Sequence, residues 1–304
     1  MSGENQDWKG TTGGGTIGQK ALFILFRLVN IRIGYVLLAL VVPFYMIFNR
    51  RDYLAIKDYF KRIGYTKHIN RQIYKNHFLF GQMMMDRFYL FARGKNTFTS
   101  EITNWDSFTQ LLEGDSGFII SGAHMGNFEI CGYFMKQKIK KLHAVVYGGE
   151  SEFLLTNRAK ALAGNSASFI SISSNMSHLF TIKTALDNKD IVSMPCDRLF
   201  GSKKAFTFPF LGYPAQFPMG GFMLAAQLEV PMISLFVMRE RKMKYHIYCM
   251  PVEVDRSQYK SSREVARALC HTYVTQLEEM VNKYPHQWFN FFHFWNIDEN
   301  DTTF

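Results

Sequence analysis

From residue 116 onward, the sequence alternates between short apolar runs and longer amphipathic segments. The apolar runs are typical of buried strands, which we expect at residues 118–121, 142–147, 168–171, 191–195, 232–238 and 245–251. The longer segments are typical of helices, which we expect at residues 127–137, 151–163, 176–188, 220–228 and 261–283. Strands separated by helices of this length predict an α/β fold, with a mostly parallel central sheet flanked by helices.

A second constraint is the apolar segment ALFILFRLVNIRIGYVLLALVVPFYMIF, at residues 21–48. Its last 16 residues carry no charge, which is short of the roughly 20 residues that cross a bilayer as a helix. Because Arg27 and Arg32 can extend to the membrane surface, the whole segment is long enough to span the membrane or to lie obliquely in it. A buried helical hairpin is the alternative. We expect an N-terminal membrane-associated helical region.

The basic excess of the protein is confined to the first third of the chain. Residues 1–100 hold 15 basic and 5 acidic side chains, whereas residues 101–304 hold 20 of each. A nucleic-acid enzyme would more often line its groove with basic residues throughout the domain, so we expect no nucleic-acid partner. Basic residues that follow an apolar segment predict anionic inner-membrane lipid as a partner, with the rest of the chain facing the cytoplasm.

These features divide the chain into four regions. We expect a flexible N-terminal segment at residues 1–20, a membrane anchor helix at 21–48, a basic helical region at 49–115 and an α/β domain that carries the chemistry at 116–304. The four cysteines are each separated by more than 20 residues, so their spacing predicts neither a zinc site nor a redox pair. We interpret them as reduced thiols of a cytosolic domain.

The candidate site follows the first predicted strand of the α/β domain, where the sequence reads GAHMGNFEI. Ligands of such folds bind beyond the carboxyl ends of the strands. His124 and Glu129 can meet there if His124 lies in the turn and Glu129 in the first turns of the following helix. His293 and Asp298 have the same spacing, but they lie in an aromatic stretch without a strand-turn-helix setting.

A histidine oriented by a carboxylate can remove a proton from a hydroxyl or an amine. Because the sequence has no G-x-S-x-G motif, we expect the hydroxyl of the substrate to attack directly. Free amides at the start of the following helix would stabilise the resulting oxyanion. The alternative is a structural turn histidine without a catalytic role.

Three features together resemble a known family. They are the GAHMGNFE turn, Asp197 at the end of a later strand, and the segment FTFPFLGYPAQFPMGG at residues 206–221. They resemble the late acyltransferases of lipid A biosynthesis, the lauroyl and myristoyl transferases of the lysophospholipid acyltransferase superfamily. The resemblance covers roughly residues 20–255, and the Gly and Pro positions of the third feature make it the most specific.

The resemblance implies a membrane-bound acyltransferase of the bacterial inner membrane. Its members move a fatty acyl chain from acyl carrier protein to a hydroxyl of a lipid A precursor or related glycolipid, with no metal and no cofactor beyond the carrier-protein thioester. By the same resemblance, His124 is the general base and Glu129 its orienting carboxylate. The substrate-binding residues that it implies are Asn127, Arg158, Asp197 and Arg198.

The C-terminal part departs from the pattern of the family. Members that act on lipid A usually end in a tryptophan followed by a basic His-Arg-Arg cluster, whereas this chain reads QWFNFFHFWN at residues 287–296. The acceptor is therefore open, and an aryl-polyene-type lipid is an alternative to a lipid A precursor. A lipid or thioester hydrolase and a non-enzymatic lipid-binding membrane protein are the alternatives outside acyl transfer.

Overall fold

A computed structural model describes residues 26–27, 29–93, 97–131, 139–147, 167–172, 177–199, 204–241 and 243–295. The helices are α2 (Ile31–Phe48), α3 (Arg50–Arg62), α4 (Ile69–Arg93), α5 (Trp105–Glu113), α8 (Ser177–Asp187), α9 (Gly220–Gln227) and α10 (Ser262–Lys283), with short 3₁₀-helices η2 (Phe128–Ile130) and η3 (Arg256–Gln258). The strands are β1 (Thr99–Thr103), β2 (Phe118–Gly122), β3 (Leu142–Tyr147), β4 (Ala167–Ile172), β5 (Ile191–Pro195), β6 (Ala205–Phe210), β7 (Tyr213–Pro218), β8 (Met232–Arg239) and β9 (Lys244–Pro251).

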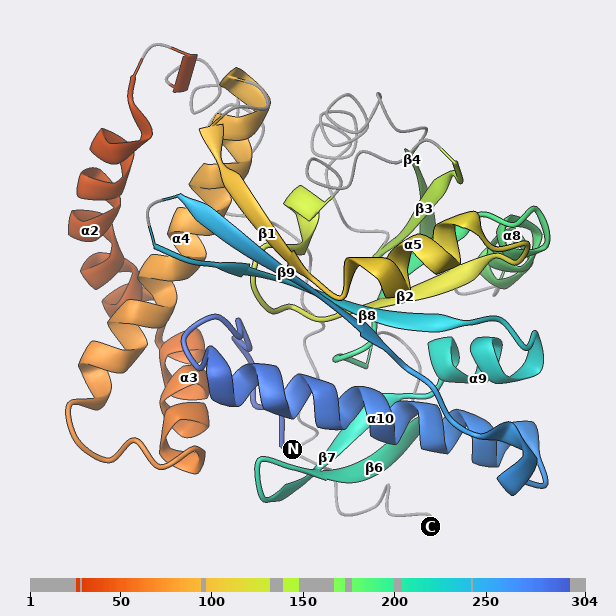
Figure 1. The fold of residues 1–304 in the computed structure, drawn as a ribbon. Coiled ribbons are helices and arrows are strands. Elements are labelled where there is room, and N and C mark those ends of the chain that lie inside the picture. Colours follow the sequence, from red (N-terminus) through yellow and green to blue (C-terminus); the bar gives the residue numbers. More distant parts are fainter. Residues whose placement is uncertain are drawn as a thin grey trace.

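The centre of the structure is a seven-stranded sheet with the order β1-β9-β8-β2-β5-β3-β4 (Figure 1). Its neighbouring strands are parallel except for the antiparallel pair β8 and β9. Strands β6 and β7 form a separate antiparallel hairpin. The predicted α/β fold with a mostly parallel sheet is confirmed, and each of the six expected strands is present.

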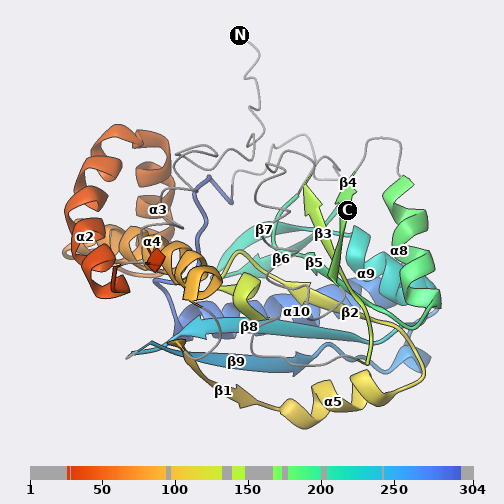
Figure 2. The ribbon, with the colours of Figure 1, turned by 90° about the horizontal axis from the view of Figure 1, so that it is seen from above.

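The two faces of the sheet are covered by different helices. Along β8, Met232, Phe236 and Met238 belong to one apolar cluster, which also contains side chains of α8, α9 and α10. Ile233, Leu235 and Val237 belong to a second cluster, which contains side chains of α5 and of the N-terminal helices. Side chains that alternate along the strand therefore enter two cores, which is typical of a sheet buried on both sides. Figure 2 shows α10 and α5 on opposite sides of β8.

The predicted boundary at residue 115 is wrong. Strand β1 pairs in parallel with β9, and α5 packs on the same side of the sheet, so both elements belong to the α/β domain. Strand β1 is an exposed edge strand, and its sequence, TSEIT, lacks the apolar run by which the buried strands are recognised. The expected flexible segment at residues 1–20 lies outside the described residues.

Three of the five helices predicted in the α/β domain are present, and the other two lie largely or entirely outside the described residues. The described part of the expected helix at 127–137 contains only the single 3₁₀ turn η2 and Cys131, and residues 132–138 lie outside the described ranges. The expected helix at 151–163 also lies outside them. The predictions at 176–188, 220–228 and 261–283 correspond to α8, α9 and α10.

Helices α2, α3 and α4 form a layer beside one end of the sheet (Figures 1 and 2). Helix α2 starts at Ile31 because Asn30 caps it, and the Asn30 side chain accepts a hydrogen bond from the backbone N–H of Arg32 at 3.0 Å. It is the one helix of the described chain that is long and apolar enough to cross a membrane. The predicted helix at 21–48 is thus confirmed from residue 31, whereas residues 21–25 and 28 lie outside the described residues.

Candidate active site

The turn after β2 brings His124 to the carboxyl edge of the sheet. Gly126 has a φ of +62°, and a Cβ atom on it would lie 2.2 Å from the carbonyl oxygen of Val237 in β8. The next residue, Asn127, donates its backbone N–H to that same oxygen at 2.7 Å. Glycine is therefore required at position 126, because only a residue without a side chain lets the turn lie this close to β8.

His124 and Asp197 form the central pair of the site. Asp197 follows β5, which is the parallel neighbour of β2, so the ends of the two strands place both residues at the same edge. One carboxylate oxygen of Asp197 lies 2.8 Å from His124 Nδ1, and the other accepts the backbone N–H of His124 at 2.8 Å. This geometry holds the imidazole with a proton on Nδ1 and its lone pair on Nε2.

The charge of Asp197 is stabilised even though its side chain is buried. Burial alone would raise the pKa of this carboxyl group, but the charge of His124, the two hydrogen bonds from His124 and the nearby Arg198 lower the pKa to about 2. The carboxylate therefore remains ionised at neutral pH. An ionised partner on Nδ1 stabilises the imidazolium that forms when Nε2 takes up a proton.

The predicted role of Glu129 is corrected by this geometry. The carboxylate that orients Nδ1 of His124 belongs to Asp197, whereas Glu129 forms an ion pair with Arg87 of α4. Each side chain of that pair is 14% exposed. Glu129 lies in the 3₁₀ turn η2, where its side chain pairs with Arg87 of α4 and not with His124 Nδ1. The ion pair instead joins the segment after His124 to α4.

The side chain of Asn127, which was predicted to contact substrate, instead forms hydrogen bonds within the protein. Its buried side-chain amide donates to the carbonyl oxygen of Met83 in α4 and to the hydroxyl of Tyr245 in β9, each at 3.1 Å. The backbone amides of the turn are occupied too, since Gly126 donates to the carbonyl of Gln287 and Asn127 to that of Val237. These two amides of the turn are therefore not available to an oxyanion, and the expectation for the amides at the start of the following helix stays a prediction.

Arg198 extends from the site toward the C-terminal aromatic segment. Its Nη2 donates to the carbonyl oxygen of Phe289 at 2.6 Å, and its guanidinium lies 5.1 Å from the ring centre of Phe292. Burial lowers the pKa of Arg198, and the adjacent Asp197 opposes this shift. Its buried Nε has no hydrogen-bond partner among the described residues. The other arginine predicted to bind substrate, Arg158, lies outside the described residues.

A buried polar cluster lies behind the turn that carries His124, and the sequence did not predict it. Asp86 of α4 is fully buried and accepts hydrogen bonds from Tyr35 of α2, from Tyr245 of β9 and, at 2.9 Å, from Arg239 Nε of β8. Arg239 also donates to the Tyr35 hydroxyl at 3.2 Å. Tyr245 in turn accepts the Asn127 amide, so the cluster connects α2 with the turn that carries His124. Asp86 is the one acidic residue of α4, and this was the sequence signal for the cluster.

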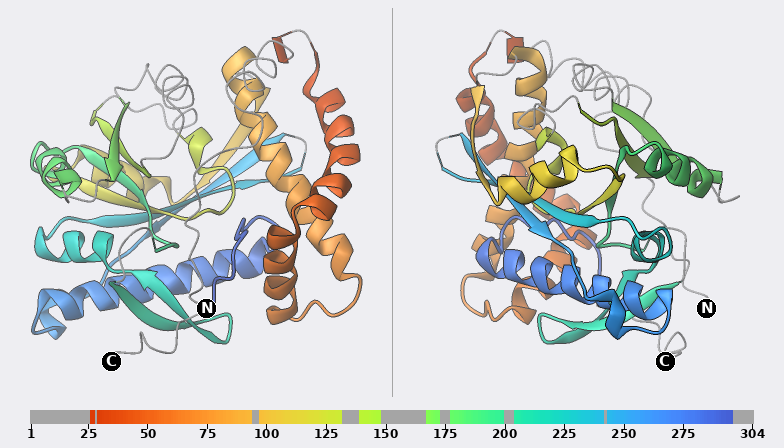
Figure 3. Two further views of the ribbon diagram at one scale, coloured as in Figure 1. Left: turned by 180° about the vertical axis from the view of Figure 1, so that it is seen from behind. Right: turned by 45° about the vertical axis from the view of Figure 1, so that its right-hand side comes forward.

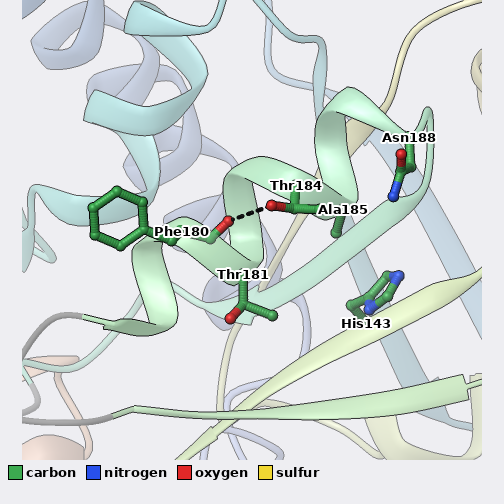
Figure 4. A pocket seen from close by; sticks show the side chains of 6 residues that line it. All are labelled: His143, Phe180, Thr181, Thr184, Ala185 and Asn188. Atoms are coloured by element: carbon green, nitrogen blue, oxygen red, sulfur yellow. Dashed lines mark hydrogen bonds between the residues drawn. The ribbon is translucent and has the colours of Figure 1, made fainter.

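A second histidine-aspartate pair lies in the same sheet, away from this site. His143 is near the start of β3, and its Nε2 lies 3.0 Å from a carboxylate oxygen of Asp190, which precedes β5. The pair is therefore at the amino edge of the strands, opposite to His124. His143 borders a cavity of about 320 Å³ under α8, whose other lining side chains include the exposed Phe180 (Figure 4).

Comparison with known proteins decides the family. The sequence profile of the bacterial lipid A biosynthesis acyltransferases matches residues 66–296, a range that contains the His124 turn and Asp197. The chain belongs to this family. It is therefore an acyltransferase that acts on lipids, as the resemblance implied, and the non-enzymatic alternative is excluded. The match begins after α2 and α3.

This acyltransferase is also similar to solved structures, of which one is an acyltransferase of another lipid. The crystal structure of the 1-acyl-sn-glycerophosphate (LPA) acyltransferase PlsC from Thermotoga maritima matches with a TM-score of 0.36 and 13% sequence identity. The match covers 84% of this chain and 98% of that chain. None of the curated protein sequences that were compared with the chain matches it.

Proposed function

We propose that this enzyme transfers a fatty acyl chain from acyl carrier protein to a hydroxyl of a lipid A precursor or related glycolipid, at the cytoplasmic face of the inner membrane. The observation that carries the proposal is the contact between His124 and the buried, ionised Asp197 at the carboxyl edge of the sheet. The family match supports a lipid acceptor. The length of the acyl chain and the identity of the acceptor are determined by the lipid mass spectrometry described below.

The proposed reaction uses His124 as a general base. Its Nε2 accepts the proton of the acceptor hydroxyl while the hydroxyl oxygen attacks the carbonyl carbon of the thioester. The tetrahedral intermediate then collapses, the carbon-sulfur bond breaks, and the imidazolium returns the proton to the departing thiolate. Asp197 acts as a positioning residue that fixes the ring and stabilises its positive charge. No cofactor is needed beyond the acyl thioester.

Arg198 is the proposed contact to an anionic acceptor. It follows Asp197 directly, and its buried Nε lacks a hydrogen-bond partner among the described residues, so one donor is available for a substrate oxygen. A guanidinium is suited to phosphate and carboxylate groups because it offers several donors in a fixed plane. The proposal thus keeps Arg198 as a substrate-binding residue, whereas Asn127 and Glu129 position the turn.

Lipid mass spectrometry is the most informative experiment. Bacteria that lack the gene are compared with cells that produce the wild-type protein, His124→Ala or His143→Ala. We expect wild type and His143→Ala to add the same acyl mass to one lipid, and His124→Ala to add none, because general-base catalysis contributes about 10²- to 10⁴-fold. His143 is the matched control, since it also contacts an aspartate of the same sheet. An unchanged acyl mass in the His124→Ala cells would contradict the mechanism.

The same samples separate acyl transfer from hydrolysis. A hydrolase releases free fatty acid from the acyl carrier protein without adding mass to any lipid. With purified protein, we expect consumption of acyl carrier protein thioester to require a hydroxyl-bearing acceptor. Thioester consumption at the same rate without acceptor would favour the hydrolase.

A further inference from the structure

Helix α2 has one packed face and one exposed apolar face along its whole length. The exposed side chains form a stripe of large apolar residues at helical spacing: Ile33, Val36, Leu37, Leu40, Val41, Phe44, Ile47 and Phe48. Three of them that are seven residues apart, Ile33, Leu40 and Ile47, are 54%, 63% and 69% exposed. A stripe of this size on a described surface is typical of a contact with lipid or with another protein.

The N-terminal end of α2 contacts the α/β body. Ile31 is fully buried in the same apolar cluster as Leu112 of α5 and Ile247 of β9. One turn later, the hydroxyl of Tyr35 donates to the buried Asp86 and accepts from Arg239 of β8. The start of the helix is therefore held against the central sheet by both apolar packing and hydrogen bonds.

The C-terminal end of α2 packs against α4 and against the apolar core on the other face of the sheet. Met46 packs against the other core, which contains Tyr59 of α3 and Trp288 of the C-terminal segment. The neighbouring Tyr45 lies 5.7 Å, ring to ring, from His77 of α4. The basic residues Arg50 and Arg51 follow immediately and are exposed.

Between these ends, α4 covers the packed face of α2. The hydroxyl of Tyr74 donates to the carbonyl oxygen of Ala39 at 3.1 Å. Leu38 lies so close to Gly81 that a Cβ atom there would be 2.6 Å from Leu38 Cδ1. Helix α2 is thus attached over its full length, about 27 Å for 18 residues at 1.5 Å per residue.

We infer that α2 lies in the plane of the membrane, with its exposed stripe in one leaflet that contains anionic lipid, and does not cross the bilayer. A helix that spans the membrane has its two ends on opposite sides, yet here both ends pack against one folded unit that has charged and polar elements on its surface. Exposed arginines lie near both ends of the stripe, Arg32 at the start and Arg50 and Arg51 at the finish, where they can reach anionic headgroups. The inference rests on the membrane association proposed above.

The depth of three positions along the stripe tests the inference. Ile33→Cys, Leu40→Cys and Ile47→Cys, each in a Cys131→Ser background of the full chain, are labelled with a small fluorophore and bound to phosphatidylcholine vesicles that contain phosphatidylglycerol. Brominated lipids then report the depth of each label. We expect equal, shallow depths at the three positions. A spanning helix would place position 40 about 10 Å deeper than either end, because it is seven residues from each.

The matched control is Phe180→Cys on α8, an aromatic position that is 76% exposed on the opposite side of the molecule from α2 (Figure 3). We expect no quenching there. A centre deeper than both ends would overturn the inference, and so would quenching at position 180 equal to that on the stripe. Absence of quenching at all three stripe positions would also overturn it and would instead favour a second protein copy on the stripe. Acyl transfer, measured separately on the same preparations, reports on the proposed function and not on the orientation of α2.

Discussion

At the scale of the residue, the catalytic proposal depends on the contacts that both carboxylate oxygens of Asp197 make with His124. Both of its carboxylate oxygens contact His124, one at the ring nitrogen and one at the backbone amide, so the ring is fixed relative to its own main chain. Only 1% of the Asp197 side chain is exposed, whereas 24% of the His124 side chain is exposed. The pair thus combines a buried, ionised carboxylate with an imidazole that an acceptor can reach.

The low pKa of Asp197 predicts a specific pH dependence of stability. Because the folded protein lowers this pKa to about 2, the ionised carboxylate stabilises the fold above the ordinary pKa of about 4, and the stabilisation is lost as the pH falls toward 2. The size is about 2 kcal/mol, at roughly 1.4 kcal/mol per pKa unit. We expect the difference in free energy of unfolding between wild type and Asp197→Asn, measured by urea denaturation, to shrink by this amount between pH 5 and pH 2. A difference that does not change with pH would contradict the charge assignment.

The sequence could identify His124 but not its partner. His124 was recognisable because glycine and alanine surround it directly after an apolar run. Glu129 was the natural choice of partner, since a local spacing is all that a single sequence displays. The contact with Asp197 joins residues 73 positions apart and depends on β5 being the neighbour of β2, which the pattern of apolar runs does not specify.

At the scale of the element, the catalytic turn is held between α4 and two strands. Helix α4 contributes Met83, Asp86 and Arg87, which contact Asn127, Arg239 and Glu129 in that order. Strand β8 contributes the Val237 carbonyl that accepts the turn amide. The turn is therefore fixed by a helix that also packs against α2, so α2, α4 and the candidate active site are parts of one packed unit.

Removal of Asp86 should strongly destabilise this unit. Asp86→Ala would leave Arg239 buried without its charge partner, a loss that typically costs about 3–5 kcal/mol of unfolding free energy. The control is Asp187→Ala, which breaks the exposed pair with Lys183 and should cost less than about 1 kcal/mol. Thermal unfolding in detergent measures both. Equal, small effects of the two substitutions would show that the Asp86 cluster does not hold the helices to the sheet.

The predicted elements and the missed ones differ in one physical property. Strands β2, β5 and β8 are buried on both faces and therefore read as continuous apolar runs. The edge strand β1 has no apolar run. The β6–β7 hairpin contains prolines at positions 209, 214 and 218, and proline disfavours the prediction of a strand. The strands that were not predicted, β1, β6 and β7, are therefore recognisable by their pairing with other strands and not by their amino-acid composition.

At the scale of the whole molecule, the uneven charge has a structural counterpart. Exposed basic residues follow α2 along α3, the next loop and the start of α4: Arg50, Arg51, Lys61, Lys67, Arg71 and Lys75. The sequence predicted this division between a basic, apolar front part and a balanced remainder. It left open whether α2 spans a membrane or lies along its surface, because length and composition do not reveal that both helix ends pack against the same folded unit.

The basic front part predicts a charge-dependent affinity for vesicles. Lys67→Gln with Arg71→Gln should weaken binding to vesicles with phosphatidylglycerol about 30-fold, since each basic residue near an anionic surface contributes about 1 kcal/mol. Lys183→Gln with Lys189→Gln removes the same charge from exposed positions of the body and should leave binding nearly unchanged. Vesicle flotation at low and high salt measures both. An equal loss in the two variants would indicate a general charge effect without a defined membrane side.

The turnover number of two variants tests the central claim most directly, that His124 is a general base positioned by Asp197. Acyl transfer is measured with purified, folded Asp197→Asn and Glu129→Gln proteins, using acyl carrier protein thioester and the acceptor identified by mass spectrometry. We predict that Asp197→Asn lowers kcat by about 10²- to 10⁴-fold, because it removes the charge that stabilises the imidazolium, while Glu129→Gln stays within about tenfold of wild type. A large loss in Glu129→Gln together with near-normal turnover in Asp197→Asn would contradict the account.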